Sequence, residues 1–250
     1  MDMQYEIELA LMAGRAYEST RYDINWFPVP DGWTEMQHKE GDSGFEAVSF
    51  FNGPDLAHST EIVISYAGTY DKDLTGDWVA NVNLATGLGS AQLLQAAEYY
   101  LQVKAQITAA NPNATITLTG HSLGGGLAAL VGVFFGVHAT TFDQAPFANS
   151  AEQNLLTPDV AANLKSVLAA ELDSNGNRLY DDNALAGLIN FLQQRDTNGG
   201  IPNSNLVSNI RVDGEFLSSA PISSFDITRE MGTGCFLMEF RVVSDALVRR

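Results

Sequence analysis

The residue best suited to carry out chemistry is Ser122, the centre of a Gly-x-Ser-x-Gly pentapeptide at Gly120–Gly124. The pentapeptide follows an alternating Ile/Leu/Thr stretch, Thr115–Thr119, and leads into an apolar run, Leu123–Phe135. A strand that turns into a helix through this pattern forms a nucleophile elbow, which exposes the serine hydroxyl at the end of a sheet. The turn is so tight that its two glycines should have no room for a Cβ. The pattern therefore predicts a strained, nucleophilic serine whose oxyanion is stabilised by the amino end of the following helix.

A mostly parallel sheet is predicted to carry this serine. Segments rich in Val, Ile, Phe and Thr and bounded by turn residues are the predicted strands: Phe45–Phe51, Glu61–Tyr66, Thr115–Thr119, Thr140–Phe142, Ile210–Val212 and Met238–Val243. A helical period from Ser90 to Ala110 separates the second strand from the third, and the N-terminus predicts an amphipathic helix with Ile7, Ala10 and Leu11 on one side. Alternating strands and helices indicate an α/β domain with crossover helices.

The stretch 148–206 interrupts this alternation. It contains two helical patterns, Thr157–Leu172 and Asn183–Gln194, separated and followed by Asn/Asp/Gly-rich loops. We expect a helical cap insertion in a single domain that spans residues 1–250. Several of its leucines could offer a surface to an acyl chain, although most should pack against each other. If the insertion is a cap, cutting it out should raise access to soluble esters.

Composition excludes several classes of partner and cofactor. The chain has 13 Lys and Arg against 30 Asp and Glu, a net charge of −17, which argues against nucleic-acid binding and against an anionic membrane surface. The single Cys235 excludes an internal disulfide. No apolar run reaches the ~18 residues that span a bilayer, and acids at the N-terminus stand where a cleavable signal would carry basic residues.

Two Asn/Asp/Gly-rich loops, Asp173–Asn177 and Asp196–Gly200, superficially resemble calcium loops. In the first, glycine falls at the fourth position rather than the sixth, and no Glu closes a 12-residue loop. We expect solvated turns. No zinc or nucleotide pattern is visible, so no metal and no cofactor is predicted.

The chain resembles the class 3 (fungal-type) lipases of the α/β-hydrolase superfamily. Four stretches in the family's order carry the resemblance: Ile64–Thr69, which ends like the family's Arg-Gly-Thr strand with Ala67 in place of Arg; Asp77–Val79; the elbow Gly120–Gly124; and Thr141–Pro146. The resemblance implies an α/β-hydrolase fold, a mostly parallel central sheet flanked by helices, and serine-esterase chemistry.

The resemblance also implies roles for residues around the serine. The oxyanion hole would be formed by the amides of Thr69, at a strand end, and Leu123, next to the nucleophile. The acid would be Glu215, with Asp213 as the alternative, if it follows the later strand as in class 3 lipases. Asp143 stands where those lipases have Gly, and an acid at this earlier strand end resembles pancreatic-type lipases. We favour Asp143 slightly and keep Glu215 as a candidate.

The base is missing from the expected place, because such triads run Ser, acid, His along the chain. The four histidines are His38, His58, His121 and His138, and all precede the candidate acids. A histidine beyond Arg250 is the first explanation, recruitment of His58 or His38 is the second, and an inactive hydrolase fold is the third. His121 should pack below the elbow, and His138 should open a strand at the end opposite the serine.

These observations predict a serine carboxylic-ester hydrolase that acts on lipid esters, as a triacylglycerol lipase or a phospholipase A1. The alternatives are a small-ester esterase or thioesterase, and an inactive binding domain of a larger secreted protein. The expected partner is a small lipid ester, with transient contact to a lipid interface, no nucleic acid and a monomeric state. We expect an extracellular protein, with the cytoplasm as the alternative.

Overall fold

The structure is a computed structural model that describes residues 2–17, 26–41, 44–68, 88–152, 159–211 and 228–230. Its elements in chain order are α1 (Met3–Arg15), β1 (Trp33–Glu40), β2 (Glu46–Asn52), η2 (Leu56–His58), β3 (Glu61–Tyr66), α3 (Leu88–Ala110), β4 (Thr115–His121), α4 (Leu123–Phe135), β5 (His138–Phe142), α5 (Ala148–Ala151), α6 (Val160–Ala170), α7 (Ala186–Asn198), η3 (Ser204–Leu206), β6 (Val207–Arg211) and β7 (Thr228–Glu230).

The described strands form one sheet in the order β1-β2-β3-β4-β5-β6-β7. Strands β3 to β7 are parallel, whereas β2 is antiparallel to both β1 and β3. The carboxyl ends of β3 to β7 therefore share one edge of the sheet, which we call the catalytic edge. The end of β1 and the start of β2 lie at this edge too. The prediction of a mostly parallel sheet is confirmed.

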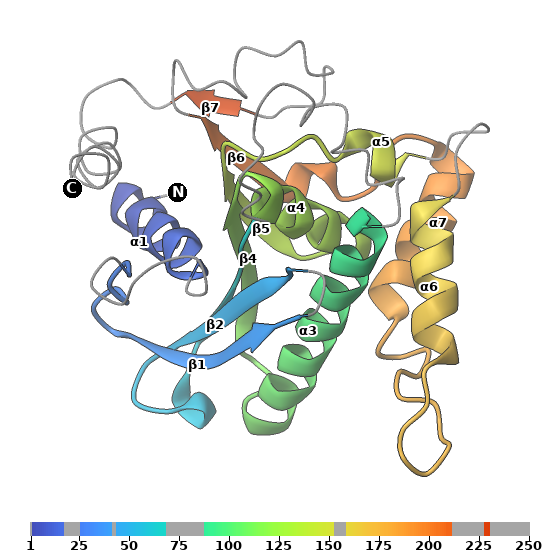
Figure 1. Ribbon diagram of the computed structural model, residues 1–250, viewed down its shortest axis with the longest axis horizontal. Coiled ribbons are helices and arrows are strands. Elements are labelled where there is room, and N and C mark those ends of the chain that lie inside the picture. Colours follow the sequence, from blue (N-terminus) through green and yellow to red (C-terminus); the bar gives the residue numbers. More distant parts are fainter. Residues whose placement is uncertain are drawn as a thin grey trace.

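Helices cover both faces of the sheet (Figure 1). Helix α1 lies on one face, where its apolar side joins β2, β3 and β5 in a small core. Helices α3, α4, α6 and α7 lie on the other face and build the larger core. A parallel sheet with helices on both faces and an elbow after its central strand is the α/β-hydrolase fold that the sequence predicts.

The buried side of α1 differs from the predicted one. Leu9, Ala10, Met12 and Ala13 are buried, whereas Ile7 and Leu11 are only half-buried. The buried set follows the helical spacing of three and four residues, and Ala10 is the one member that the prediction shared. The amphipathic helix itself is confirmed.

Most predicted elements are present with shifted ends. The helix predicted to start at Ser90 starts at Leu88, and the cap helices are shorter or displaced by a few residues. Strands β1 and β7 were not predicted, and the predicted strand Met238–Val243 lies outside the described residues. β1 was missed because polar residues, including the consecutive Gln37–Glu40, make up most of this edge strand. Within the described part of the chain, no helix is both long enough and apolar enough to cross a membrane.

Candidate active site

Ser122 has the strained backbone of a nucleophile elbow. It directly follows β4 and precedes α4, with φ 55° and ψ −124°. A side chain at positive φ costs about 1–3 kcal/mol, and such residues persist where the surrounding structure enforces them. The predicted elbow geometry is therefore present.

The glycines on either side of Ser122 allow the elbow to form. A Cβ placed on Gly124 would lie 2.0 Å from the carbonyl oxygen of Tyr66, and one on Gly120 would lie 2.5 Å from the carbonyl of Gly124. Both contacts are with backbone atoms, which cannot rotate away. The expectation that neither position has room for a Cβ is confirmed.

The peptide groups of Ser122 are hydrogen-bonded to the last residue of β5 and to the segment that follows it. The Ser122 amide donates to the carbonyl of Phe142 over 3.1 Å. The Ser122 carbonyl accepts from the amide of Ala145 over 2.8 Å and from the amide of Gly126 over 3.1 Å. These bonds hold Ser122, the end of β5 and the loop after it in one hydrogen-bonded unit.

Asp143, the favoured acid, lies next to this unit. The register pairs His121 of β4 with Phe142 of β5, so Ser122 and Asp143 each stand one residue past that pair. Asp143 has φ 42° and is 5% exposed, and its amide donates to the carbonyl of Ile210 over 3.0 Å. The carboxylate is therefore placed at the catalytic edge on the strand adjacent to the serine.

A buried polar network supports the turn at Asp143. The Thr141 hydroxyl donates to Gln144 Oε1 over 2.6 Å, and the Gln144 amide donates to Asn209 Oδ1 over 3.3 Å. The backbone of Gln144 also packs against α4, because a Cβ on Gly125 would lie 3.1 Å from the Gln144 Cα. This network was not predicted from the sequence. The stretch Thr141–Pro146, which carries part of the resemblance, and the glycine run Gly124–Gly126 were its available signals.

The amino end of α4 faces the end of β3. A Cβ placed on Gly68 would lie 3.3 Å from the Leu123 nitrogen and 3.4 Å from the Gly124 nitrogen. The first amides of a helix have no partner within the helix and carry its positive dipole end. The Leu123 amide is therefore available where an oxyanion would form. Thr69, the other expected donor, lies outside the described residues.

Tyr17 is a site neighbour that sequence reasoning missed. Its hydroxyl donates to the carbonyl of His121 over 3.1 Å and lies 3.5 Å from the His121 Nδ1. The same hydroxyl would lie 2.9 Å from a Cβ on Gly68. The end of α1 thus reaches the junction of β3 and β4, immediately beside the elbow. Nothing in the local sequence around Tyr17 indicated this contact.

The histidines lie in different places relative to Ser122. His58 belongs to η2, before β3, and His138 begins β5, so both lie at the edge opposite the serine. The placement of His138 confirms the prediction, whereas recruitment of His58 is wrong. His38 lies near the catalytic edge, but on β1, three strands from β4, or about 14 Å across at the usual strand spacing. This separation also argues against His38 as the base.

The later candidate acids, Asp213 and Glu215, lie outside the described residues.

The Asp173 loop is the turn that the sequence predicted. Asp173 Oδ1 accepts the amides of Asn175 and Asn177 over 2.8 and 2.9 Å. The backbone bonds of Asn177 are the largest of several hydrogen bonds that lower the pKa of Asp173 below its ordinary value. The carboxylate serves to close its own loop.

The insertion helices supply core residues. Side chains from α6 and α7 are buried with α3 and α4: Leu164, Leu168, Leu188 and Phe191, together with Leu185 just before α7. Val167 is exposed, at 38%. Cutting out the insertion would therefore also remove part of the larger core. Its role in controlling access to Ser122 stays a prediction.

Asp159 and Arg195 join the two insertion helices. Asp159 caps α6 by accepting the Ala162 amide over 3.0 Å, and Arg195 Nη1 donates to it over 3.0 Å from the last turn of α7. Desolvation raises the pKa of Asp159, but the hydrogen bonds from Arg195 and Ala162 outweigh it and lower the pKa below its ordinary value. The pair fixes the start of one helix to the end of the other.

Comparison with known proteins matches the chain to one protein family. A family described as phospholipase-like, with a Tle-like phospholipase domain, matches residues 8–220. The extracellular phospholipase A1 of Serratia liquefaciens is 34% identical over 140 residues, which are 56% of this chain and 38% of that protein. The chain thus matches well under half the length of this relative. The resemblance to lipases predicted from the sequence is confirmed.

Two solved lipases resemble the chain in structure. Lipase II from Rhizopus niveus is 15% identical with a TM-score of 0.47, covering 92% of this chain and 80% of that one. The lipase from Rhizopus microsporus var. chinensis is 14% identical with a TM-score of 0.46, covering 91% and 74%.

Proposed function

Because the chain belongs to the family of Tle-like phospholipase domains, we propose that it hydrolyses carboxylic esters of lipids, with phospholipids as the preferred class. The observation that carries this proposal is Ser122, held at positive φ between two glycines at the catalytic edge. A strained serine at this position is the nucleophile of an esterase elbow. The name of the Serratia relative supports the choice of phospholipid and of the acyl ester bond.

In the proposed reaction the Ser122 hydroxyl attacks the ester carbonyl as a general base takes its proton. The oxyanion is stabilised by the amide of Leu123 and, by resemblance, that of Thr69; one such donor is worth about 100- to 1000-fold in rate. The alcohol leaves with a proton and an acyl-serine remains, which water then hydrolyses. Asp143, with Glu215 as the alternative, orients the base and stabilises its charged form.

The proposal extends to location and assembly. We propose an extracellular enzyme that acts as a monomer at a lipid interface. Its acidity, with a net charge of −17, and the extracellular location in the relative's name support this setting.

A comparison of turnover by this chain and by Ser122→Ala tests the proposal. The substrates are p-nitrophenyl esters of two to sixteen carbons and phosphatidylcholine vesicles. We expect release of fatty acid by the unchanged chain and none above background by Ser122→Ala. A fluorophosphonate should label the former alone. Hydrolysis confined to short esters would favour the small-ester alternative. Absence of both labelling and turnover would favour a binding domain.

A further inference from the structure

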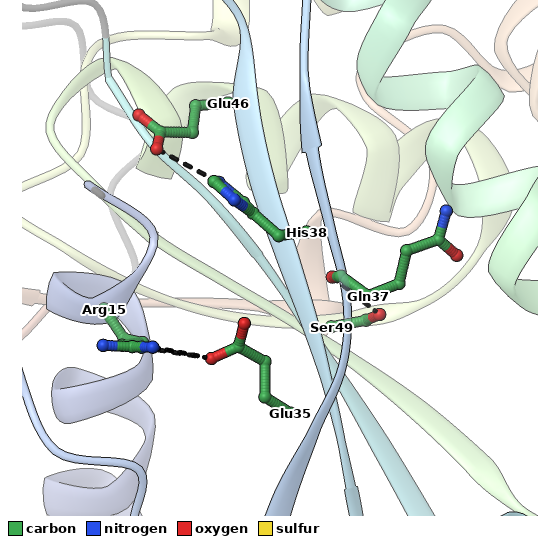
Figure 2. Close-up of polar contacts among 6 residues, drawn as sticks. All are labelled: Arg15, Glu35, Gln37, His38, Glu46 and Ser49. Carbon is green, nitrogen blue, oxygen red and sulfur yellow. Dashed lines mark hydrogen bonds and ion pairs between the residues drawn. The ribbon is translucent and has the colours of Figure 1, made fainter. Parts of the chain in front are cut away.

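A second group of chemically capable side chains lies near the catalytic edge, on the β1–β2 hairpin. One ligand atom each from His38, Glu40 and Glu46 lies within 4.8 Å of the other two. His38 Nε2 is 3.1 Å from Glu46 Oε1, and Figure 2 shows the two side chains pointing toward each other. We propose that these three residues bind a divalent cation of the zinc class.

The strand register brings the three donors together. Glu40 of β1 is paired directly with Glu46 of β2, and His38 precedes Glu40 by two residues. Because side chains alternate along a strand, His38 and Glu40 share one face of the hairpin. Two carboxylates directly opposite each other on antiparallel strands repel and destabilise the pair. A cation bound by both would turn this repulsion into attraction.

The exposure of the three side chains leaves a route for an ion. The Glu46 side chain is 5% exposed and that of His38 is 21% exposed, while Glu40 is exposed at the end of β1. An ion can therefore enter from the Glu40 side, and water can complete its coordination. The geometry points to a shallow site with a buried floor at Glu46.

The donor set selects the metal class. Calcium and magnesium prefer sites made only of oxygen atoms. An imidazole nitrogen with two carboxylates suits zinc and other transition metals, which accept three protein ligands and water. We therefore expect Zn²⁺ to bind more tightly than Ca²⁺.

Backbone hydrogen bonding connects this site to the proposed oxyanion hole. The amide of Ala67 donates to the carbonyl of Glu46 over 2.9 Å, and Ala67 is followed by Gly68, which faces the Leu123 amide. A cation that restrains Glu46 would also restrain the end of β3. The site nevertheless lies two to three strands from β4, roughly 10–14 Å across the sheet, so its occupancy can be measured without turnover.

Isothermal titration calorimetry tests the proposal. The Ser122→Ala chain is first stripped of metal with EDTA and is then titrated with ZnCl₂ and, in a separate experiment, with CaCl₂. We expect one Zn²⁺ per chain, weaker Ca²⁺ binding, and a loss of Zn²⁺ affinity of at least about tenfold in Glu40→Gln and in His38→Ala, as a lost metal contact implies. Hydrogen exchange at the Ala67 amide should slow when Zn²⁺ is bound. Binding is read without turnover, so the result does not depend on the proposed hydrolysis.

His58→Ala is the matched control. His58 Nδ1 lies 2.7 Å from Asp55 Oδ1 at the opposite edge, which reproduces a histidine–carboxylate pair without the facing strand pair. Its removal should leave the Zn²⁺ affinity unchanged. Absence of saturable binding, or equal affinity in Glu40→Gln, would overturn the proposal and leave His38 and Glu46 as an ion pair. Glu40 is exposed, so Glu40→Gln tests the site even if His38→Ala misfolds.

Discussion

Ser122 and Asp143 occupy equivalent positions on adjacent strands, each one residue past the paired His121 and Phe142. Both have positive φ, 55° and 42°, although neither is glycine. Hydrogen bonds from the Ser122 amide to Phe142 and from the Ala145 amide to Ser122 hold the two turns side by side. The catalytic edge therefore concentrates backbone strain at the two residues with the strongest case for nucleophile and acid.

Substitution of the two candidate acids separates the alternatives that the sequence left open. If Asp143 orients the base, Asp143→Asn should lower kcat about 10⁴-fold with little change in KM, as in serine triads. Glu215→Gln should then retain most of the activity. Steady-state kinetics on one phospholipid ester give both numbers. The opposite ranking would assign the acid to Glu215.

The backbone strain at Ser122 should lower the stability of the fold, so that replacing this serine by glycine relieves the strain while it removes the nucleophile. Ser122→Gly and Ser122→Ala both remove the nucleophile, but only glycine adopts φ 55° without cost. We expect Ser122→Gly to be more stable than Ser122→Ala by about 1–3 kcal/mol. Urea unfolding of the two inactive variants measures this difference. Equal stabilities would show that the turn is not strained.

Two glycines of α4 should respond very differently to a methyl group. Gly124→Ala forces a Cβ to 2.0 Å from the Tyr66 carbonyl oxygen, so we expect a loss of about 3 kcal/mol or more. Gly126→Ala meets the Ala145 carbonyl at 3.2 Å, and alanine's helix propensity offsets about 1 kcal/mol. Thermal unfolding should therefore show a large loss for the first variant alone. Similar losses would contradict the tight strand–helix packing.

The ion pair between Asp159 and Arg195 should matter more than an exposed one in the same insertion. The Arg195 side chain is 3% exposed and that of Asp159 is 24% exposed. Removing one member of a buried pair costs about 3–5 kcal/mol, and we expect Arg195→Ala near 3 because Asp159 retains some water. Arg178→Ala, which breaks the exposed pair with Asp182, should cost about 0–1 kcal/mol. Denaturant titration compares the two.

The stability of the fold should decrease as the pH rises above 4.5. Burial, together with a hydrogen bond and repulsion from Glu98, raises the pKa of Glu171 from 4.5 to about 7. The folded protein therefore binds this proton more tightly than the unfolded chain, so the contribution is complete below pH 4.5 and is lost as the pH rises through 7.

Glu171→Gln should flatten this part of the pH profile and raise Tm at pH 8. Tm measured from pH 4.5 to 8 checks the effect, and Asp182→Asn controls for the loss of a negative charge from the same insertion. An unchanged slope in Glu171→Gln would assign the pH dependence to other groups.

Local sequence patterns predicted the elbow well, because the constraints on it are local. Gly120, Ser122 and Gly124 lie within one strand–turn–helix unit, and the apolar run after Ser122 marks the helix. The contact of Gly124 with the Tyr66 carbonyl of β3 is the part of the elbow that local sequence does not show. The contact between Tyr17 and His121 could not be predicted, since it joins residues 104 positions apart through the packing of α1. The His38–Glu46 pair was missed for a similar reason, because it depends on the register of an edge strand whose polar sequence resembles a loop.

The insertion at 148–206 shows what helical periodicity alone cannot predict. Its helices were predicted from periodicity, but periodicity does not say which element an apolar face will contact. Leu168 and Leu188 pack into the larger core beside α3 and α4, whereas the sequence indicated only that most of these leucines would be packed.

The hydrogen bonds at both the amide and the carbonyl of Ser122 have a consequence for thermal inactivation. Its amide is bonded to the last residue of β5 and its carbonyl to the segment after β5, and that segment is bonded in turn to β6 through Asp143 and Asn209. The serine cannot leave its position by the fraying of one loop, since three neighbouring strands would have to separate with it. Heat inactivation should therefore coincide with global melting and show no earlier phase in which a folded but silent enzyme accumulates.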